Sequence, residues 1–339
     1  MIDSIIGKVS GGQSLEREEM HNVMDQIMDG QWRDEQIGLL LTALRAKGES
    51  VEEVVGAAES LRKHMTRIQS PHATYLDTCG TGGDGTGTFN ISTASAIVTA
   101  AAGVPVAKHG NRAVSSKSGS SDVLTKLGVN IHADVAQVER CLAEVDLCFC
   151  FAPLMHKSMK NVAEVRRQLG VPTIFNMLGP LCNPAGAPHQ LLGVGRPELR
   201  PLLSSALQQL GTKRSAVVCG EDGLDEVTIG STSYVSLATE SGIEPLEWAP
   251  EDFGLERASK LELVIDGPDE SAARIREILD GKTGPSRDVV VINTATALWI
   301  TGFSEDLKKC ADKAAEALDS GKAKELLAKL AAVSHEPVA

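Results

Sequence analysis

Hydrophobic positions recur at helical spacing in the first seventy residues. Apolar side chains repeat three or four positions apart in the segments 20–28, 37–44 and 54–61, which is the period of a helix with one buried face. Ser50 stands three residues before Glu53, the spacing of an N-terminal capping box. We therefore expect residues 1–71 to form a small domain made of helices alone.

After Pro71 the pattern changes to short apolar runs that are separated by glycine-rich turns and helical stretches. Strands that alternate with helices favour a mostly parallel sheet covered on both faces, so residues 72–339 are predicted to form a larger α/β domain. A final pair of helices is expected over 304–334, broken near Ser320. The expected strands are 75–78, 104–107, 147–151, 216–219 and 289–292.

Composition narrows the classes of partner. The chain of 339 residues is 42% hydrophobic and 23% charged, enough apolar content for two folded domains. Its 45 acidic and 33 basic residues give a net charge of −12, which disfavours nucleic acid and anionic membranes as partners. The few aromatic residues offer no stacking platform for single strands. Because the chain as a whole is negatively charged, any anion-binding site must depend on a local group of residues.

The cysteines and the N-terminal sequence point to a reducing compartment. The seven cysteines are an odd number without a CxxC motif, so neither a disulfide framework nor a zinc module is indicated. Residues 1–13 lack the pattern of a secretory signal, and the uncharged run 85–107 is too interrupted to span a bilayer. We expect a cytoplasmic protein with no membrane segment.

The most informative segment is free of acidic residues. Residues 85–121 contain no Asp or Glu, where about five would be expected at the chain's average. The segment does contain Lys108, Arg112 and Lys117, together with many hydroxyl side chains. Burial alone would explain missing charge but not these cations, so an anion-binding surface is the better interpretation.

A glycine-rich loop precedes this segment. Residues 77–88 read DTCGTGGDGTGT and lead from a predicted strand to a helix that we expect to begin near Ser92. Glycines let the backbone approach an oxyanion, and a helix N-terminus directs free N–H groups at it. Residues 80–85 also fit GxGxxG, but no acidic residue follows at the distance that a dinucleotide site needs, and a Walker motif is absent.

A second loop and a carboxylate pair complete the expected site. Residues 108–120 follow another predicted strand and carry three cations and several hydroxyls, so two phosphate-binding loops on neighbouring strands predict a ligand with two separated phosphate groups. Asp225 and Glu226 are adjacent in a turn, where we expect them to be exposed. Facing a polyphosphate, such carboxylates become magnesium ligands, because Mg²⁺ binds one or two carboxylates plus phosphate oxygens.

Five motifs together resemble the anthranilate phosphoribosyltransferase family. They are DTCGTGGD at 77–84, NIST at 90–93, KHGNRAVSS at 108–116, GPL at 179–181 with NP at 183–184, and DGLDE at 222–226. The resemblance implies a helical domain, completed by a segment near 165–185 and joined by a hinge to the α/β domain. It also implies a cytoplasmic homodimer that binds phosphoribosyl pyrophosphate, anthranilate and two Mg²⁺ ions per subunit.

The resemblance also implies roles for individual positions. Ser92, Asp225 and Glu226 resemble metal ligands, and Asn111 and Arg166 resemble anthranilate contacts. Because the amine of anthranilate is unprotonated at neutral pH, we assign no general acid or base and expect Lys108, Asn111 and Arg166 to position the substrates. The implied substrate-binding residues are Gly80, Gly83, Asp84, Thr88, Asn90, Ile91, Ser92, Thr93, Lys108, His109, Gly110, Asn111, Arg112, Ala113, Val114, Ser115, Ser116, Ser120 and Arg166.

The chain departs from the family pattern mainly on the acceptor side. Met155, Lys157 and Ser158 surround His156, a weaker candidate than His109 for contact with the acceptor, and Pro172 replaces a frequent Arg. Two alternatives stay open: a nucleoside phosphorylase of similar architecture, which would lack the acidic metal pair, and a non-catalytic relative that kept the loops.

Overall fold

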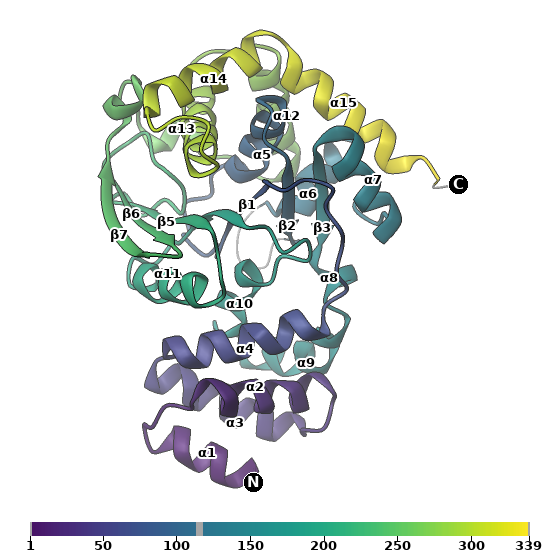
Figure 1. The fold of residues 1–339 in the computed structure, drawn as a ribbon, viewed down its shortest axis with the longest axis vertical. Coiled ribbons are helices and arrows are strands. Elements are labelled where there is room, and N and C mark those ends of the chain that lie inside the picture. Colours follow the sequence, from purple (N-terminus) through teal and green to yellow (C-terminus); the bar gives the residue numbers. More distant parts are fainter. Residues whose placement is uncertain (1, 113–117, 338–339) are drawn as a thin grey trace.

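The computed structural model describes residues 2–112 and 118–337, with a helical bundle at one end of the molecule and a larger α/β domain at the other (Figure 1). The three predicted helical segments lie within α2, α3 and α4, which confirms them. Ser50 caps α4: its hydroxyl accepts the Glu53 N–H at 3.3 Å, and the Glu53 carboxylate accepts the Ser50 N–H at 2.8 Å. The bundle contains α1 (Ile2–Ser10), α2 (Arg17–Met28), α3 (Asp34–Lys47) and α4 (Val51–His64).

Two helices from the middle of the chain pack on this bundle. They are α9 (Lys160–Leu169) and α10 (Phe175–Leu181). Val162 and Val165 of α9 and Phe175 of α10 are buried in the same apolar cluster as Met24 and Leu40. The chain segment that follows α10 contacts the sheet, where Asn183 donates to the Ala107 carbonyl of β2 (Val106–Gly110) at 2.8 Å.

The described residues include seven strands in one sheet, ordered β3-β2-β1-β4-β5-β6-β7. The first five in this order are parallel, and β6 and β7 pair antiparallel at the edge. The predicted mostly parallel sheet is therefore confirmed, whereas β4 and the antiparallel edge were not predicted. The strands are β1 (Leu76–Gly80), β2 (Val106–Gly110), β3 (Leu147–Phe151), β4 (His189–Gly193), β5 (Arg214–Gly220), β6 (Ser233–Thr239) and β7 (Gly242–Trp248).

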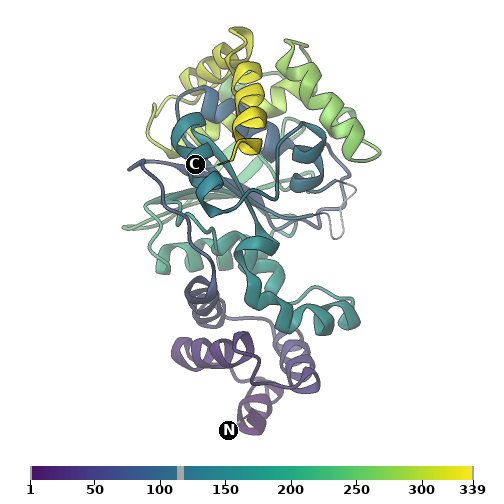
Figure 2. The ribbon, with the colours of Figure 1, turned by 90° about the vertical axis from the view of Figure 1, so that its right-hand side faces the viewer.

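Helices cover both faces of the sheet (Figure 2). Residues on one face of the sheet are buried in one apolar cluster with α5, α7 and α12 to α15. Residues on the other face are buried in a second cluster with α11 and the helical bundle. The predicted C-terminal helix pair is confirmed as α14 and α15, which are separated at Ser320–Gly321. The remaining helices are α5 (Ile91–Ala101), α6 (Ser120–Lys126), α7 (Val135–Val145), α8 (Ala152–Met155), α11 (Leu199–Gln209), α12 (Pro268–Leu279), α13 (Pro285–Ile300), α14 (Leu307–Asp319) and α15 (Lys322–His335).

The predicted strand at 289–292 is wrong. These residues lie inside α13, where every side chain from Val289 to Ile300 is buried. A helix that is enclosed on all sides shows no amphipathic period, so its β-branched run is indistinguishable from a buried strand in sequence. In this case the tertiary environment overrides the local β preference of Val and Ile.

The order of the strands in the sheet indicates where a ligand would bind. Chain order runs from β1 outward to β2 and β3 and then returns to β4 on the other side of β1, so the direction of winding reverses between β1 and β4. Ligands of open parallel sheets bind at the carboxyl ends of the strands beside such a reversal. Among the residues described, no helix is long and apolar enough to cross a membrane.

Candidate active site

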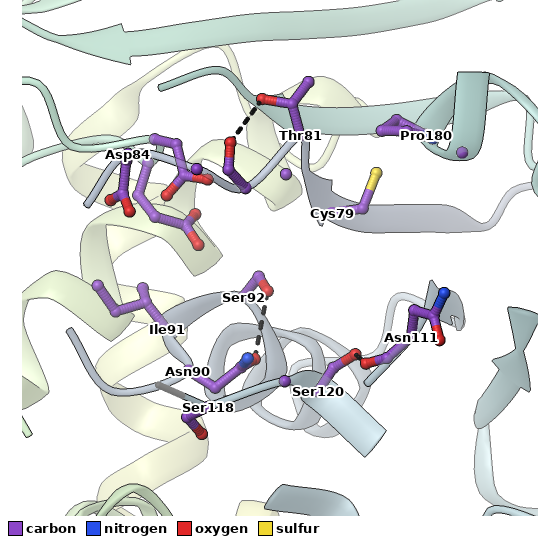
Figure 3. A pocket seen from close by; sticks show the side chains of 18 of the residues that line it. Cys79, Thr81, Asp84, Asn90, Ile91, Ser92, Asn111, Ser118, Ser120 and Pro180 are labelled. Atoms are coloured by element: carbon purple, nitrogen blue, oxygen red, sulfur yellow. Dashed lines mark hydrogen bonds between the residues drawn. The ribbon is translucent and has the colours of Figure 1, made fainter. Parts of the chain in front are cut away.

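A cavity of about 300 Å³ opens at the carboxyl ends of β1 and β2 (Figure 3). Asp84 lies at one end of the view, and Asn111 and Pro180 lie at the other. The sequence-predicted residues that line it are Gly80, Gly83, Asp84, Thr88, Asn90, Ile91, Ser92, Lys108, His109, Gly110, Asn111, Arg112, Ser120, Asp225 and Glu226. Thr93 and Arg166 are not among the lining residues.

The glycine-rich loop forms one wall of the cavity. Gly83 has a φ of +80°, a conformation that side-chain-bearing residues rarely adopt. Close packing also requires Gly193 at the end of β4, since a Cβ atom there would lie 1.6 Å from the Asp225 carbonyl oxygen. Asn90 then caps α5 by accepting the Thr93 N–H at 3.1 Å. The loop and the free N–H groups of α5 therefore make an anion cradle.

Lys108 places a cation under this cradle. Its side chain is buried, and Nζ donates to the Thr78 carbonyl at 2.5 Å and to the Ser92 hydroxyl at 3.1 Å. Burial lowers the pKa of Lys108, while the negative charge of Asp77 acts against that effect. An ammonium held by one carbonyl and one hydroxyl keeps a hydrogen available for an anion in the cavity.

Carboxylates gather opposite this cation. Asp225 and Glu226 are half-buried and line the cavity, which corrects the expectation that they are exposed. Burial, followed by the negative charge of Asp84, raises the pKa of Asp225 to about 7, and burial together with Asp225 raises the pKa of Glu226. The turn that carries them folds back against Gly80 and Gly193, so the pair faces inward.

This cluster of carboxylates is suited to bind a divalent cation that enters the cavity together with a ligand. Within residues 2–112 and 118–337, no three His, Cys, Asp or Glu side chains form a metal-binding cluster. The crowding that raises the pKa of Asp225 and Glu226 would be relieved by a positive charge between them. Mg²⁺ characteristically combines one or two carboxylates with phosphate oxygens and water, so a fully formed protein cage is not required.

The second predicted loop contributes both of its described ends. His109, Gly110, Asn111 and Arg112 line the cavity, as does Ser120, whose hydroxyl donates to the Asn111 carbonyl at 3.3 Å. The other predicted members of this loop, Ala113, Val114, Ser115 and Ser116, lie outside the described residues.

Arg166 lies on α9, with its guanidinium 5.3 Å from the centre of the Phe175 ring. Burial lowers its pKa, and no carboxylate contributes to that shift. The next residue, Arg167, is instead exposed and forms an ion pair with Glu164 at 2.6 Å. A partly buried arginine without an acidic neighbour among the described residues is suited to bind an anionic ligand.

The end of the cavity that contains Asn111 also includes a residue that was not predicted from the sequence. Asn176 lines it one helical turn before Gly179 and Pro180. The proximity of Asn176 to the GPL motif at 179–181 was the available signal. His109 also lies on this side: its Nδ1 is 3.1 Å from the Gly179 carbonyl oxygen, and its Nε2 is 3.2 Å from Nε2 of the buried His156.

Two family models match the chain along most of its length. The model described as glycosyl transferase family, a/b domain, matches residues 72–324, and the one described as glycosyl transferase family, helical bundle domain, matches residues 3–65.

Relatives and solved structures agree with these matches. An anthranilate phosphoribosyltransferase of Rhodopirellula baltica is 49% identical over 95% of this chain and 94% of its own length. The crystal structure of the enzyme from Thermus thermophilus superimposes with a TM-score of 0.92 at 40% identity, covering 98% of this chain and 99% of that one. The Saccharomyces cerevisiae enzyme in complex with PRPP and Mg has a TM-score of 0.90 at 29% identity, covering 98% and 97%. This chain therefore belongs to the anthranilate phosphoribosyltransferase family.

Proposed function

We propose that this chain transfers the phosphoribosyl group of 5-phosphoribosyl 1-pyrophosphate to the amine of anthranilate, giving N-(5-phosphoribosyl)anthranilate and pyrophosphate in tryptophan biosynthesis. The main observation that supports this proposal is a single cavity whose two ends differ in their chemistry. A glycine loop, a helix N-terminus, Lys108 and three carboxylates surround one end, and Asn111, Asn176 and His109 surround the other. The first end suits a metal-bound polyphosphate, and the second suits a small polar aromatic molecule.

The donor is assigned to the loop end. Backbone N–H groups of the glycine loop and of the first turn of α5 would bind the pyrophosphate, with Lys108 beneath it. Ser92, Asp225 and Glu226 would hold Mg²⁺, for which we propose two ions per subunit. Bound Mg²⁺ would offset the charge that develops on the leaving pyrophosphate.

The acceptor is assigned to the opposite end. Asn111, which lines the cavity, would hydrogen-bond anthranilate, and Arg166, which lies on α9 over the Phe175 ring, would attract its carboxylate. The Saccharomyces cerevisiae relative in complex with 4-fluoroanthranilate has a TM-score of 0.87 at 26% identity, covering 98% of both chains. This supports binding of an aminobenzoate by this fold.

Catalysis then rests on positioning and charge. The bond from the anomeric carbon to the pyrophosphate oxygen breaks, its electron pair leaves with pyrophosphate, and the amine nitrogen bonds to the anomeric carbon and releases one of its protons to the departing pyrophosphate. Lys108 and the backbone N–H groups stabilise the leaving group, while Asn111 and Arg166 hold the amine in line. Enclosure of the cavity would keep water from intercepting the ribosyl cation.

The test is the loss of anthranilate fluorescence in the presence of the purified protein. Consumption should require phosphoribosyl pyrophosphate and Mg²⁺ together, and each should give no signal alone. Phosphate plus a nucleoside serves as the control for the phosphorylase alternative, which the carboxylates in the cavity already disfavour. Absence of consumption with all components would refute the proposed reaction and favour a non-catalytic relative.

The expected homodimer and cytoplasmic location are also proposals. Measurement of the molar mass in solution by light scattering tests the first, and a mass of one chain would contradict it. Localisation of a tagged full-length chain by fluorescence microscopy tests the second.

A further inference from the structure

Asn176 is a polar residue of the cavity to which the reaction described above gives no task. It belongs to α10, whose residues Phe175, Met177 and Leu178 are buried in the apolar cluster of the helical bundle. Asn176 is exposed between them and lines the cavity together with Gly179, three positions further along the helix. The packing of α10 therefore holds Asn176 at the cavity wall.

Hydrogen bonds to Thr173 fix the orientation of the Asn176 amide. The Thr173 N–H donates to Oδ1 of Asn176 at 3.0 Å, and the Asn176 N–H donates to the Thr173 carbonyl oxygen at 2.9 Å. A backbone N–H can only donate, so the side-chain atom that faces it must be the amide oxygen. Thr173 is buried, so the amide nitrogen Nδ2 is the end of the side chain that is left open to the cavity.

Nδ2 of Asn176 has two hydrogens available for a ligand. Among the residues that the structure describes, it donates to no protein atom. The carboxylates that line the cavity, Asp84, Asp225 and Glu226, belong to the opposite end. A group that can only donate attracts an acceptor oxygen, and it binds an ionised oxygen more strongly than a neutral one.

Asn176 lies at the end of the cavity that the proposed function assigns to the acceptor. It precedes Pro180 of α10 by about one helical turn, and Pro180 lies with Asn111 at this end (Figure 3). The Gly179 carbonyl oxygen is 3.1 Å from Nδ1 of His109, a contact that holds α10 beside β2. Asn111, which follows β2, and Asn176 on α10 therefore face an acceptor from two different elements.

The chemistry of the transfer decides which group of the acceptor Asn176 contacts. The amine nitrogen attacks through its lone pair, and a hydrogen bond donated to that lone pair would oppose the attack. The carboxylate offers acceptor lone pairs on two oxygens and forms no new bond in the reaction. A pair of N–H donors therefore assists the transfer only when it binds the carboxylate.

We propose that Asn176 binds the carboxylate of the acceptor through Nδ2, so that the site selects an aromatic amine with an ionised carboxylate over a neutral one. The inference rests on the proposed function, because anthranilate supplies the carboxylate. This contact adds to the attraction assigned to Arg166, which is not among the residues that line the cavity.

The variant Asn176→Asp separates binding of the carboxylate from a structural role. Its side chain still accepts the Thr173 N–H, so its melting temperature should lie within about 2 °C of the wild-type value. The substitution replaces two donors by a negative charge, so the KM for anthranilate at pH 7 should rise by about tenfold to a hundredfold. The KM for phosphoribosyl pyrophosphate should change little.

A neutral probe tests the selectivity of the site. In 2-aminobenzamide a carboxamide replaces the carboxylate beside the same aromatic amine, and its inhibition constant is measured in competition with anthranilate. The wild type should prefer anthranilate, and in Asn176→Asp this preference should fall by about tenfold or more, because the new carboxylate accepts an N–H of the carboxamide. An unchanged preference would overturn the proposal.

The same substitution outside the cavity is the matched control. Oδ1 of Asn130 also accepts a backbone N–H, that of His132 at 3.0 Å, and Asn130 is not among the lining residues. Asn130→Asp should therefore keep the wild-type KM for both substrates. If Asn176→Asp also kept both values, or raised both equally, Asn176 would not bind the carboxylate.

The outcomes distinguish this inference from the proposed function. Absence of anthranilate consumption by the wild type refutes the proposed function, whereas normal turnover with an unchanged KM in Asn176→Asp refutes the inference alone. If Asn176→Asp does not fold, Asn176→Ser decides the question. Its hydroxyl can accept the Thr173 N–H, and loss of the amide donors should still raise the KM for anthranilate by about tenfold.

Discussion

Asp225 carries its charge in surroundings that oppose it. Burial and Asp84 raise its pKa to about 7, far above the value of about 4 expected in the unfolded chain. A carboxyl whose folded pKa is raised binds its proton more tightly in the native state, so the contribution of Asp225 to stability is greatest below pH 4 and is lost as pH rises from about 4 to 7. Such a cost is typical of a group retained for function rather than for stability.

Replacing Asp225 and Glu226 by Asn and Gln should separate stability from activity. In EDTA, the free energy of unfolding measured in urea should equal that of the wild type at pH 4 and exceed it by about 1 kcal/mol at pH 8. Turnover with Mg²⁺ should fall by about two orders of magnitude or more. Glu221→Gln, an exposed carboxylate in the same turn, is the matched control. Near-normal activity at limiting Mg²⁺ would remove the pair from the metal site.

Arg166 and Arg167 offer a matched comparison on one helix. Arg166→Ala should raise the KM for anthranilate by about tenfold to a hundredfold, because a charge-assisted contact contributes about 1.5–3 kcal/mol to binding. The KM for phosphoribosyl pyrophosphate should change little. Arg167→Ala, at an exposed position, should leave both constants unchanged. An equal effect of Arg166→Ala on both substrates would make it a structural residue that packs on Phe175.

At the scale of elements, Gln190 ties three segments together beneath the cavity. From β4 its Nε2 donates to the Pro180 carbonyl at 2.7 Å, to Oδ2 of Asp77 at 3.2 Å and to Sγ of Cys79 at 3.2 Å. Asp77 and Cys79 lie on β1, and Pro180 lies in the last turn of α10. One side chain of β4 therefore connects β1 with α10.

Gln190→Leu should lower the free energy of unfolding by about 2 kcal/mol, because it leaves the buried Pro180 carbonyl without a donor and removes one of the donors to the buried Asp77 carboxylate. The measurement is equilibrium unfolding in urea at pH 7. Gln209→Leu removes an exposed side-chain contact with Glu52 and should stay within about 0.5 kcal/mol of the wild type. Equal stabilities for the two variants would show that Gln190 does not hold these elements together.

Elements with a clear local signal were predictable, and those that depend on distant partners were not. The glycine loop and the helix expected to begin near Ser92 indicate an anion site because their chemistry is local to a few residues. The buried run at Val289 gave the wrong element, since only the tertiary fold reveals that α13 is enclosed on all sides. Asn176 and Gln190 escaped notice for a similar reason: packing between distant chain segments brings Asn176 to the cavity wall and Gln190 to the Pro180 carbonyl.

At the scale of the whole molecule, the helical bundle and the sheet are not independent bodies. A single apolar cluster runs from Met24 in α2 through Leu61 in α4 to Leu203 in α11 and Val217 in β5. The change from helical spacing to short apolar runs predicts a domain boundary near residue 71. The same pattern does not show that the helical bundle packs against the sheet. The expected hinge stays a prediction, and continuous burial limits how far the two parts can separate.

We therefore expect motion on ligand binding to occur mainly in the two loops at residues 80–93 and 108–112, to which the proposed function assigns the phosphoribosyl pyrophosphate. Phosphoribosyl pyrophosphate with Mg²⁺ should slow amide hydrogen exchange of residues 80–93 and 108–112, because phosphate oxygens accept their free N–H groups. Exchange in α4 and α11, which are buried together in the continuous cluster, should stay as it is in the free protein. Anthranilate alone should leave both loops nearly unchanged, since its assigned contacts lie at the other end of the cavity. Amide hydrogen exchange measured by mass spectrometry tests this assignment of the two loops. If anthranilate alone protected both loops as strongly as phosphoribosyl pyrophosphate does, these loops could not be the phosphate site.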